Sequence, residues 1–139
     1  MTKVIRTALQ HEADFIISLW NRCELTRPWN DPRQDFDRAL QTNNSTVLIA
    51  LNDKDIVGSV MLGFDGHRGW LYYLAVDLNH RQQGIAHRLV SAAEDWLTQI
   101  DCPKVELMVR SDNQAAKNFY QKLGWQLQDV EVYAKWLNL

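Results

Sequence analysis

The spacing of hydrophobic residues changes several times along the chain, and each spacing predicts a different element. Between positions 85 and 100 apolar residues recur every three or four positions, which is the period of a helix with one buried face. TVLIAL (46–51) and IVGSVML (56–62) are apolar runs joined by the polar NDKD, a pattern typical of a β-hairpin. WLYYLAV (70–76) is almost unbroken in its apolar character, which predicts a central strand buried on both faces.

The N-terminal part predicts a short strand followed by two helices. VIR (4–6) fits a strand, and Thr7 with Gln10 three residues later resembles a capping box ahead of a helix that ends near Cys23. A second, shorter helix should begin at Pro32, since proline suits the first turn of a helix.

The C-terminal part predicts one more helix between strands. VELMV (105–109) alternates like a strand, and AAKNFYQKLG (115–124) is helical, with Gly124 as its C-terminal cap. WQLQ (125–128) and VEVYAKWL (130–137) should close the chain as strands. This order of elements predicts an α/β fold in which helices cover the faces of a mixed sheet.

Length and composition limit the classes of function. The 139 residues fit one globular domain spanning 1–139, and 46% hydrophobic content with six Trp suffices for a packed core. The formal net charge of -2 provides no bulk positive field for nucleic acid. No apolar stretch approaches the roughly 20 residues of a membrane span, and MTKVIRTALQ lacks a signal-peptide core. We therefore expect a cytoplasmic protein with neither a nucleic-acid nor a membrane partner.

Metal and disulfide chemistry are not expected. The two cysteines, Cys23 and Cys102, lie far apart and match no paired metal-ligand spacing. Two reduced, mostly structural thiols are the default for such a chain. The sequence therefore predicts no metal site.

The segment HRQQGIAHRL (80–89) lies between the third predicted strand and the long helix. In the simplest interpretation Gly84 only permits a turn, because glycine reaches positive φ without a steric penalty. In the alternative, Gly84 and the small Ala86 keep side chains away from the helix N-terminus, where unpaired N–H groups suit an anion. The turn alone favours the first interpretation, and the surrounding elements favour the second.

Those surrounding elements carry a family resemblance. LYYLAV, RQQGIA, the long helix, a strand and N-x-x-A-x-x-F-Y-x-x-L-G-W together resemble the GNAT superfamily of acetyl-CoA-dependent N-acetyltransferases over nearly the whole chain. Arg81, Gly84 and Ala86 match its signature [QR]-x-x-G-x-[GA], with Ala86 where most members carry glycine. LWNRCELTRPWNDP and FDGHRGWLYYL look like the bacterial YpeA group. The resemblance implies a mixed, mostly antiparallel twisted sheet with about four helices on its faces.

The resemblance also implies acetyl-CoA as co-substrate and a set of residues that bind it. Main-chain groups of Leu74, Ala75 and Val76 would hold the pantetheine arm, and Asn113 would contact the same arm or cap its helix. Arg81 or Arg88 would add positive charge near the pyrophosphate. The backbone that faces the pyrophosphate would be that of Gln82, Gln83, Gly84, Ile85, Ala86 and His87.

Tyr120 is the candidate general acid, and it would also contact the cofactor. A phenol of pKa near 10 lies about 1.5 pH units above a thiol, so protonating the leaving thiolate costs only about 2 kcal/mol. A general base is less clear, because Met108 stands where related enzymes carry glutamate. Glu106, two residues earlier on the same strand face, is a tentative base whose carboxylate is displaced by about 7 Å, and a plain surface role suits it better.

The acceptor side is the least defined by sequence. Trp29 and Asp31 in one loop, with Asp65 and His67 in another, are tentative substrate residues. Asp31, Asp65 and His67 are also alternatives for the general base, although Asp and Gly are ordinary turn formers. Without a clear carboxylate base, the site suits an amine that is partly neutral at pH 7. A protein α-amine is neutral in roughly a tenth of molecules, and a lysine in a few per ten thousand.

Two functions remain open at this stage. The first is acetyl transfer from acetyl-CoA to a primary amine of a small molecule or a protein N-terminus. The second is a non-catalytic acetyl-CoA or CoA-binding or sensing module. Pairing of two chains through the closing strands, as in some relatives, also remains open.

Overall fold

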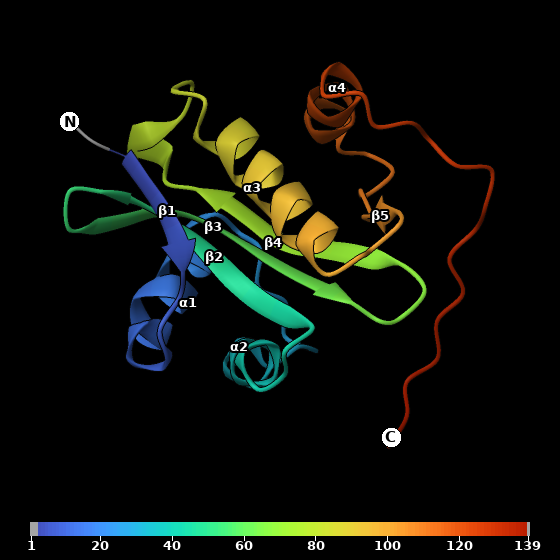
Figure 1. Ribbon diagram of the computed structural model, residues 1–139, viewed down its shortest axis with the longest axis horizontal. Helices are drawn as coiled ribbons and strands as arrows, with labels where there is room; N and C mark the ends of the chain where they lie inside the picture. Colours follow the sequence, from blue (N-terminus) through green and yellow to red (C-terminus); the bar gives the residue numbers. More distant parts are fainter. Residues whose placement is uncertain (1–2, 139) are drawn as a thin grey trace. The chain divides into compact units, whose positions relative to one another are not determined.

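The computed structural model describes residues 3–138, and the chain divides into two compact units on either side of the Leu107–Met108 bond. The first unit contains a five-stranded sheet whose spatial order is the chain order. Three joins are antiparallel and the last is parallel (Figure 1). The strands are β1 (Lys3–Thr7), β2 (Ser45–Asn52), β3 (Asp55–Phe64), β4 (Gly69–Val76) and β5 (Val105–Glu106).

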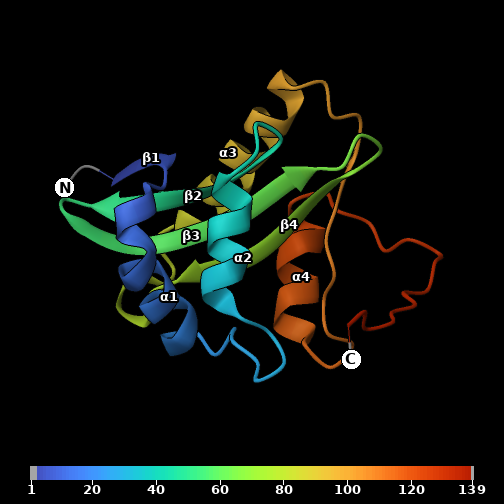
Figure 2. The ribbon, with the colours of Figure 1, turned by 90° about the horizontal axis from the view of Figure 1, so that it is seen from below.

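Three of the four α-helices belong to this first unit. α1 and α2 cover one face of the sheet and α3 covers the other (Figure 2). The helices are α1 (Ala13–Arg22), α2 (Pro32–Leu40), α3 (Ile85–Gln99) and, in the second unit, α4 (Gln114–Lys122). Short 3₁₀ turns precede α1 and α3 at Gln10–Glu12 and Leu78–His80. The predicted mixed, mostly antiparallel sheet with four helices is confirmed.

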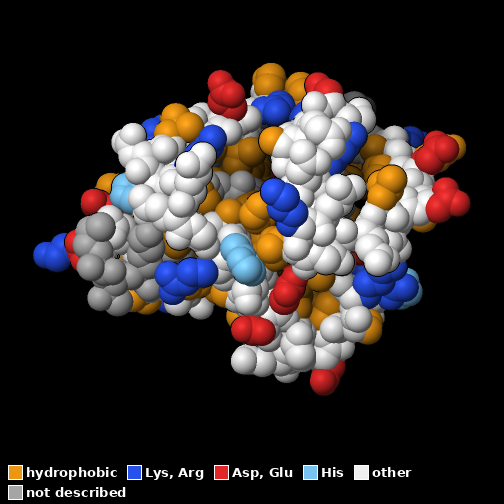
Figure 3. Space-filling model, turned by 90° about the horizontal axis from the view of Figure 1, so that it is seen from above, with side chains coloured by type: hydrophobic (Ala, Val, Ile, Leu, Met, Phe, Trp, Pro, Cys, Tyr) orange, Lys and Arg blue, Asp and Glu red, His pale blue; other side chains and the backbone are white. Residues whose placement is uncertain are grey.

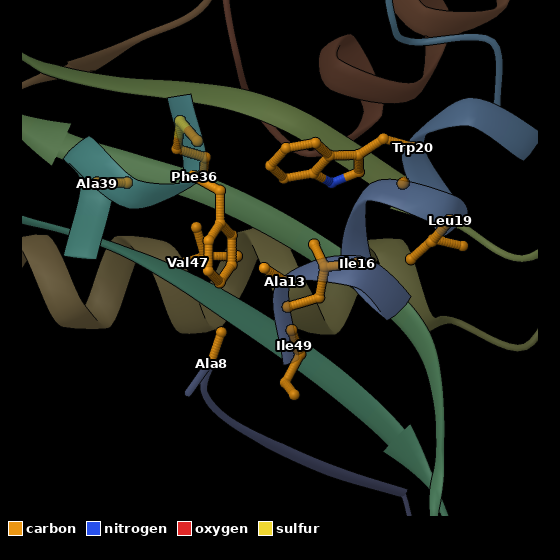
Figure 4. Packing of buried hydrophobic residues seen from close by; sticks show 11 residues of the cluster. Ala8, Ala13, Ile16, Leu19, Trp20, Phe36, Ala39, Val47 and Ile49 are labelled. Carbon is orange, nitrogen blue, oxygen red and sulfur yellow. The ribbon is translucent and has the colours of Figure 1, made fainter. Parts of the chain in front are cut away.

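The core under α1 and α2 is built around two fully buried aromatic rings. Trp20 of α1 and Phe36 of α2 meet with ring centroids 6.4 Å apart (Figure 4). On the opposite face α3 approaches β3 closely at Gly58, where a Cβ atom would lie 2.9 Å from Leu89. The buried residues of α3 belong to the predicted stripe and comprise Ile85, Leu89, Val90, Ala93 and Leu97, whereas Trp96 and Ile100 of that stripe are only partly buried.

The first helix does not begin as predicted. Thr7 is the last residue of β1, and the carboxylate of Glu12 instead accepts the Leu9 N–H at 2.8 Å. Arg6 pairs with the same carboxylate at 2.7 Å, and its hydrogen bond, with lesser help from the Leu9 N–H, lowers the pKa of Glu12. The capping interaction therefore lies two residues later than predicted, between Leu9 and Glu12. Pro32 does open α2, as predicted.

β4 differs from its prediction as a central strand buried on both faces. It is the fourth of five strands, and the Tyr72 side chain is 44% exposed. β3 holds the central place instead. The apolar run is therefore a strand, but within the described residues one of its faces is only partly covered.

In the second unit the helix is as predicted and the closing strands are not. Gly124 follows α4 with φ of +91°, the left-handed conformation expected of a C-terminal cap. The described residues of 125–138 form no strand, and the strand predicted over 105–109 is limited to Val105–Glu106. Alternating apolar residues form a strand only with a hydrogen-bonded neighbour, which local pattern cannot supply.

Among the residues that the structure describes, no helix has the length and apolar character needed to cross a membrane. Positive side chains on the α3 side are scattered and interleaved with negative ones, rather than gathered into one patch (Figure 3).

Candidate functional site

The turn between β4 and α3 combines a required glycine with open space. Gly84 caps α3 with φ of +78°, a conformation that side chains oppose. A Cβ atom built there meets nothing within 4 Å, so no packing of the protein itself excludes a side chain. The glycine is needed for its backbone conformation, and it leaves the start of α3 accessible to a ligand.

The start of α3 also has the electrostatics of an anion site. Its first turn contains no acidic residue. The first intrahelical bond runs from the Arg88 N–H to the Gly84 carbonyl at 3.1 Å, so the N–H groups of residues 85–87 lack intrahelical acceptors. Ile85 is buried and fixes this end of the helix on the sheet. N–H groups without intrahelical acceptors at a fixed helix N-terminus fit a phosphate-bearing ligand.

Arg81 ties this turn to the end of β4. Its Nε donates to the Val76 carbonyl at 3.2 Å, and Asp77 caps the intervening 3₁₀ turn by accepting the Asn79 N–H. Arg22 of α1 pairs with Asp77 at 3.1 Å. Arg81 thus has a positioning contact in addition to the charge predicted for it.

β4 has an open edge on the side of β5. β5 pairs only with Gly69 and Trp70, and no β5 pairing continues beyond them in the described chain. The Asp77 N–H donates to the Val57 carbonyl, and Ala75 is the partner of Ser59 in the antiparallel register. Because hydrogen-bonded and non-hydrogen-bonded pairs alternate along such strands, the N–H and carbonyl of Val76 point away from β3. This edge contains the predicted residues Leu74, Ala75 and Val76. The Val76 carbonyl already accepts from Arg81 and Cys23, so the N–H of Val76 is the group that an extended ligand could bind as a neighbouring strand does.

A bulge interrupts β4 beside this edge. The register with β3 shifts between Ser59 and Met61, and Tyr73 has φ of +53°, which is unusual for a bulky residue. Because of this bulge, Tyr72 and Tyr73 both point to the face that α1 and α2 cover. Tyr72 pairs with Met61 on that face, and Tyr73 stacks on Trp20.

Side chains from three elements hold Tyr73 in this conformation. Its ring lies 3.9 Å from Trp20 with an interplanar angle of 11°, and its hydroxyl donates to Asp35 at 2.7 Å. Ser59 accepts from Trp20 Nε1 at 2.8 Å and donates to the Tyr73 carbonyl at 3.0 Å. Burial, then the bond to Asp35, raise the pKa of Tyr73 well above its usual range. We call Trp20, Asp35, Ser59 and Tyr73 the bulge network.

A groove of about 350 Å³ opens on the same face between α2 and the β3–β4 hairpin. Tyr72 forms part of its wall, and burial followed by the charge of Asp65 raises the pKa of this tyrosine. We call this the α2 groove. It is lined by Asp35, Arg38, Ala39, Thr42, Asn44, Ser45, Met61, Leu62, Gly63, Phe64, Asp65, Trp70 and Tyr72.

Of the four predicted acceptor residues, only Asp65 lines this groove. Its carboxylate accepts the N–H groups of Arg68 and His67, each at 2.8 Å, and these bonds lower its pKa. Asp31 caps α2 by accepting the N–H groups of residues 33 and 34. Trp29 is 58% exposed and His67 lies in the exposed hairpin turn. Turn formation therefore accounts for Asp65, and helix capping accounts for Asp31.

Glu106 has a partner that sequence spacing did not reveal. Its carboxylate pairs with Arg68 Nε at 3.3 Å, across the parallel join of β4 and β5. Since the carboxylate already neutralises a guanidinium, an ion-pairing role accounts for it without catalysis. The predicted role as base stays a hypothesis.

In the second unit, Asn113 and Tyr120 lie at opposite ends of α4. Asn113 caps the helix, its side chain accepting the Ala116 N–H at 3.1 Å. Tyr120 packs against Phe119 and Trp125 with centroids 5.0 and 5.6 Å away. Burial raises the pKa of Tyr120 to about 12. The phenol therefore stays protonated and suits hydrogen-bond donation better than complete transfer of its proton to a thiolate.

Sequence reasoning did not identify Asp35, Ser59 or Tyr73. Asp35 follows Asp31 by one helical turn, and nothing in its spacing links it to a tyrosine 38 positions later. The local sequence carries no signal for the bulge, because WLYYLAV (70–76) is apolar throughout and shows no break at Tyr73.

Comparison with known proteins gives consistent matches. The model of the acetyltransferase (GNAT) family matches residues 8–125. An acetyltransferase of Sodalis glossinidius is 45% identical over 125 residues, which are 90% of this chain and 88% of the relative. An acetyltransferase of Pectobacterium atrosepticum is 45% identical over 131 residues, covering 94% and 93% of the two chains.

Solved structures agree on the fold and not on one function. An aminoglycoside N-acetyltransferase in complex with CoA matches with a TM-score of 0.83 at 19% identity, covering 96% of this chain and 94% of that chain. A transcriptional regulator from Bacillus halodurans matches with a TM-score of 0.84 at 18% identity, covering 97% and 100%. The same fold therefore occurs in proteins with different functions, and the fold alone does not identify the acceptor of this chain.

Proposed function

Because the chain belongs to the GNAT family of acetyltransferases, we propose that it moves the acetyl group of acetyl-CoA directly to a primary amine. The amine would be an α-amine of a protein or peptide, or an amine of a small molecule. Because the matched region, residues 8–125, includes parts of both compact units, we also propose that residues 1–139 act as one acetyltransferase domain.

One observation carries this proposal: the turn of residues 77–84 joins the open edge of β4 to the accessible N-terminus of α3. Exposed N–H groups at the helix start would bind the pyrophosphate, and Arg81 would add charge. Peptide groups of residues 74–76 would hold the pantetheine arm by strand-like hydrogen bonds. Both sets of groups belong to the backbone, so the proposed cofactor site depends little on side-chain identity.

Bound acetyl-CoA would supply the acetyl group as a thioester. In transfer, the amine nitrogen forms a bond to the carbonyl carbon, the carbon–sulfur bond breaks, and the nitrogen loses a proton. Main-chain N–H groups near Leu74 would stabilise the negative charge on the carbonyl oxygen. Tyr120 would donate a hydrogen bond to the sulfur, and its raised pKa keeps it protonated while the thiolate forms.

An α-amine is the favoured class of acceptor. Glu106 is paired with Arg68, and Met108 offers no carboxylate, so removal of a proton from a lysine ammonium lacks an evident base. An α-amine avoids this need because a tenth of it is already neutral at pH 7. Aminoglycosides should also be tested as acceptors, since several solved structures of this fold are aminoglycoside acetyltransferases.

The first experiment measures thermal unfolding with and without excess acetyl-CoA in the native protein and two variants. Gly84→Glu places a negative side chain at the α3 start. Gly66→Glu is the matched control, because Gly66 also has positive φ and open space but lies in the β3–β4 turn. Ligand should raise the melting temperature of the native protein and the control, and not of Gly84→Glu. No rise in the native protein at saturating ligand would contradict the proposal.

The alternative, a CoA-binding or sensing module without catalysis, is favoured by Met108, which stands where related enzymes carry glutamate, and Tyr120 argues against it. Release of free CoA thiol in the presence of amines distinguishes the two. A thermal shift with no thiol release above the hydrolysis rate, across α-amines and small amines, would favour the sensing module.

A further inference from the structure

The α2 groove has an apolar floor that the core does not fill. Among the residues that line it, Met61 of β3 and Trp70 and Tyr72 of β4 have large apolar side chains on this face of the sheet. Tyr72 is the largest of these with a substantially exposed ring. The exposure is a consequence of the bulge, which sends Tyr73 into the core and leaves Tyr72 on the same face at the groove.

The charged residues of the groove favour a cation over an anion. Its lining contains the carboxylates of Asp35 and Asp65 against the one guanidinium of Arg38, and Arg38 donates to Gln34 at 3.3 Å. Asp65 binds the backbone of its own turn. Asp35 uses Oδ2 to accept from Tyr73, and Oδ1 is the carboxylate oxygen through which it can accept from an ammonium group.

The groove also reaches the strand segment at which acetyl transfer is proposed. Tyr72 precedes Leu74 by two residues, a separation of about 7 Å along a strand, and the intervening Tyr73 is the residue bound to Asp35. An amine held at Asp35 therefore lies beside the hydroxyl of Tyr73, the residue at the bulge of β4. A ring or aliphatic chain attached next to that amine extends over the apolar floor.

From these observations we propose that the α2 groove binds the acceptor, and that the acceptor is an amine with a large apolar or aromatic group beside its amino carbon. Asp35 attracts the ammonium form and, once the nitrogen has lost its proton to solvent, accepts a hydrogen bond from the neutral amine that attacks the thioester. Tyr72 with Met61 packs against the apolar group. The inference rests on the proposed function and adds the substrate class. N-terminal residues with large apolar side chains and arylalkyl amines belong to this class, whereas small hydrophilic amines do not.

The test compares phenylalaninamide with glycinamide, two α-amines that differ by the benzyl group. Initial rates of CoA thiol release are measured against each amine at saturating acetyl-CoA. Burial of the ring should make kcat/KM for phenylalaninamide about tenfold to a hundredfold higher. Equal values for the two amines, or a preference for glycinamide, would overturn the assignment of the groove.

Two variants test the residues. Asp35→Asn removes the charge but keeps an oxygen that can accept from Tyr73, and Tyr72→Ala removes the aromatic wall. Each should raise the KM for phenylalaninamide about tenfold and leave the KM for acetyl-CoA unchanged, in a protein that still unfolds cooperatively. Asp37→Asn is the control, since Asp37 lies on the same helix, bonds to Gln10 and Arg33, and does not line the groove. If Asp35→Asn unfolds, Tyr72→Ala decides, because Tyr72 is half-exposed.

Failure of this inference is distinguishable from failure of the proposed function. If no amine releases CoA thiol although acetyl-CoA stabilises the protein, acetyl transfer itself is contradicted. If glycinamide and other hydrophilic amines are acetylated at least as efficiently, and Tyr72→Ala changes nothing, acetyl transfer stands and only the groove is excluded.

Discussion

The α3 start and the α2 groove lie in one compact unit but are built in opposite ways. At the α3 start, backbone N–H groups face open space, and the one required residue is a glycine without a side chain. In the groove, side chains from α2, β3, β4 and the segments beside them form most of the surface, and the bulge network fixes Tyr73 beside Asp35. A backbone site of this kind suits a co-substrate shared by many enzymes, and a side-chain site suits a substrate particular to one.

This contrast predicts that mutations in the core weaken binding in the groove more than binding at the α3 start. Trp20→Ala should give the largest effect, because it removes the ring stacked on Tyr73 and leaves Ser59 without its donor. Loss of a fully buried Trp costs about 3–5 kcal/mol of unfolding free energy. Urea denaturation measures that loss, and kinetics at low temperature should show KM for phenylalaninamide rising more than KM for acetyl-CoA.

Trp29→Ala is the matched control for that variant. Trp29 is exposed, so its unfolding free energy should change by less than about 0.5 kcal/mol. An equal rise of both KM values in Trp20→Ala would break the comparison, since it would mean that the two regions depend on the same packing.

The stability of the protein at alkaline pH tests the role of the bulge network. The pKa of Tyr73 is raised in the folded state, chiefly by burial, above the value near 10 of an unfolded tyrosine. The neutral form is therefore favoured by folding. Its contribution to stability is complete below pH 10 and is lost as the pH rises above 10, because the unfolded chain releases the proton first.

Tyr73→Phe should therefore be less stable than the native protein at pH 8 and lose less stability between pH 10 and 11.5. Part of the slope will remain, because the pKa of Tyr120 is also raised, to about 12. Urea denaturation at stepped pH measures both effects. Tyr133→Phe is the control, since Tyr133 is 90% exposed, and a change of slope there as large as in Tyr73→Phe would contradict the interpretation.

The smallest effect is expected at Glu106. Its pair with Arg68 is partly exposed, so Glu106→Gln should change the unfolding free energy by less than about 1 kcal/mol. The kcat should stay within about twofold of the native value between pH 6 and 9. A loss of a hundredfold or more that is restored at high pH would instead identify Glu106 as the general base.

Most of the fold was predictable because its elements carry strong local signals. The β2–β3 hairpin follows from two apolar runs around a polar turn, and the limits of α3 follow from its apolar stripe and the Gly84 turn. The predicted strands over 125–137 were wrong because alternation alone does not supply a partner strand. The Thr7 cap was wrong because Glu12 competes for the same role with the help of Arg6.

For the candidate site, the sequence by itself determined the backbone part. A glycine in a polar turn between a strand and a helix dictates positive φ and an uncovered helix start, since both depend on neighbouring residues only. The tertiary structure alone decided the groove and the bulge network. Asp35 and Tyr73 meet across 38 positions, and Trp20 and Ser59 across 39. Such contacts depend on how sheet and helices pack, which no local pattern encodes.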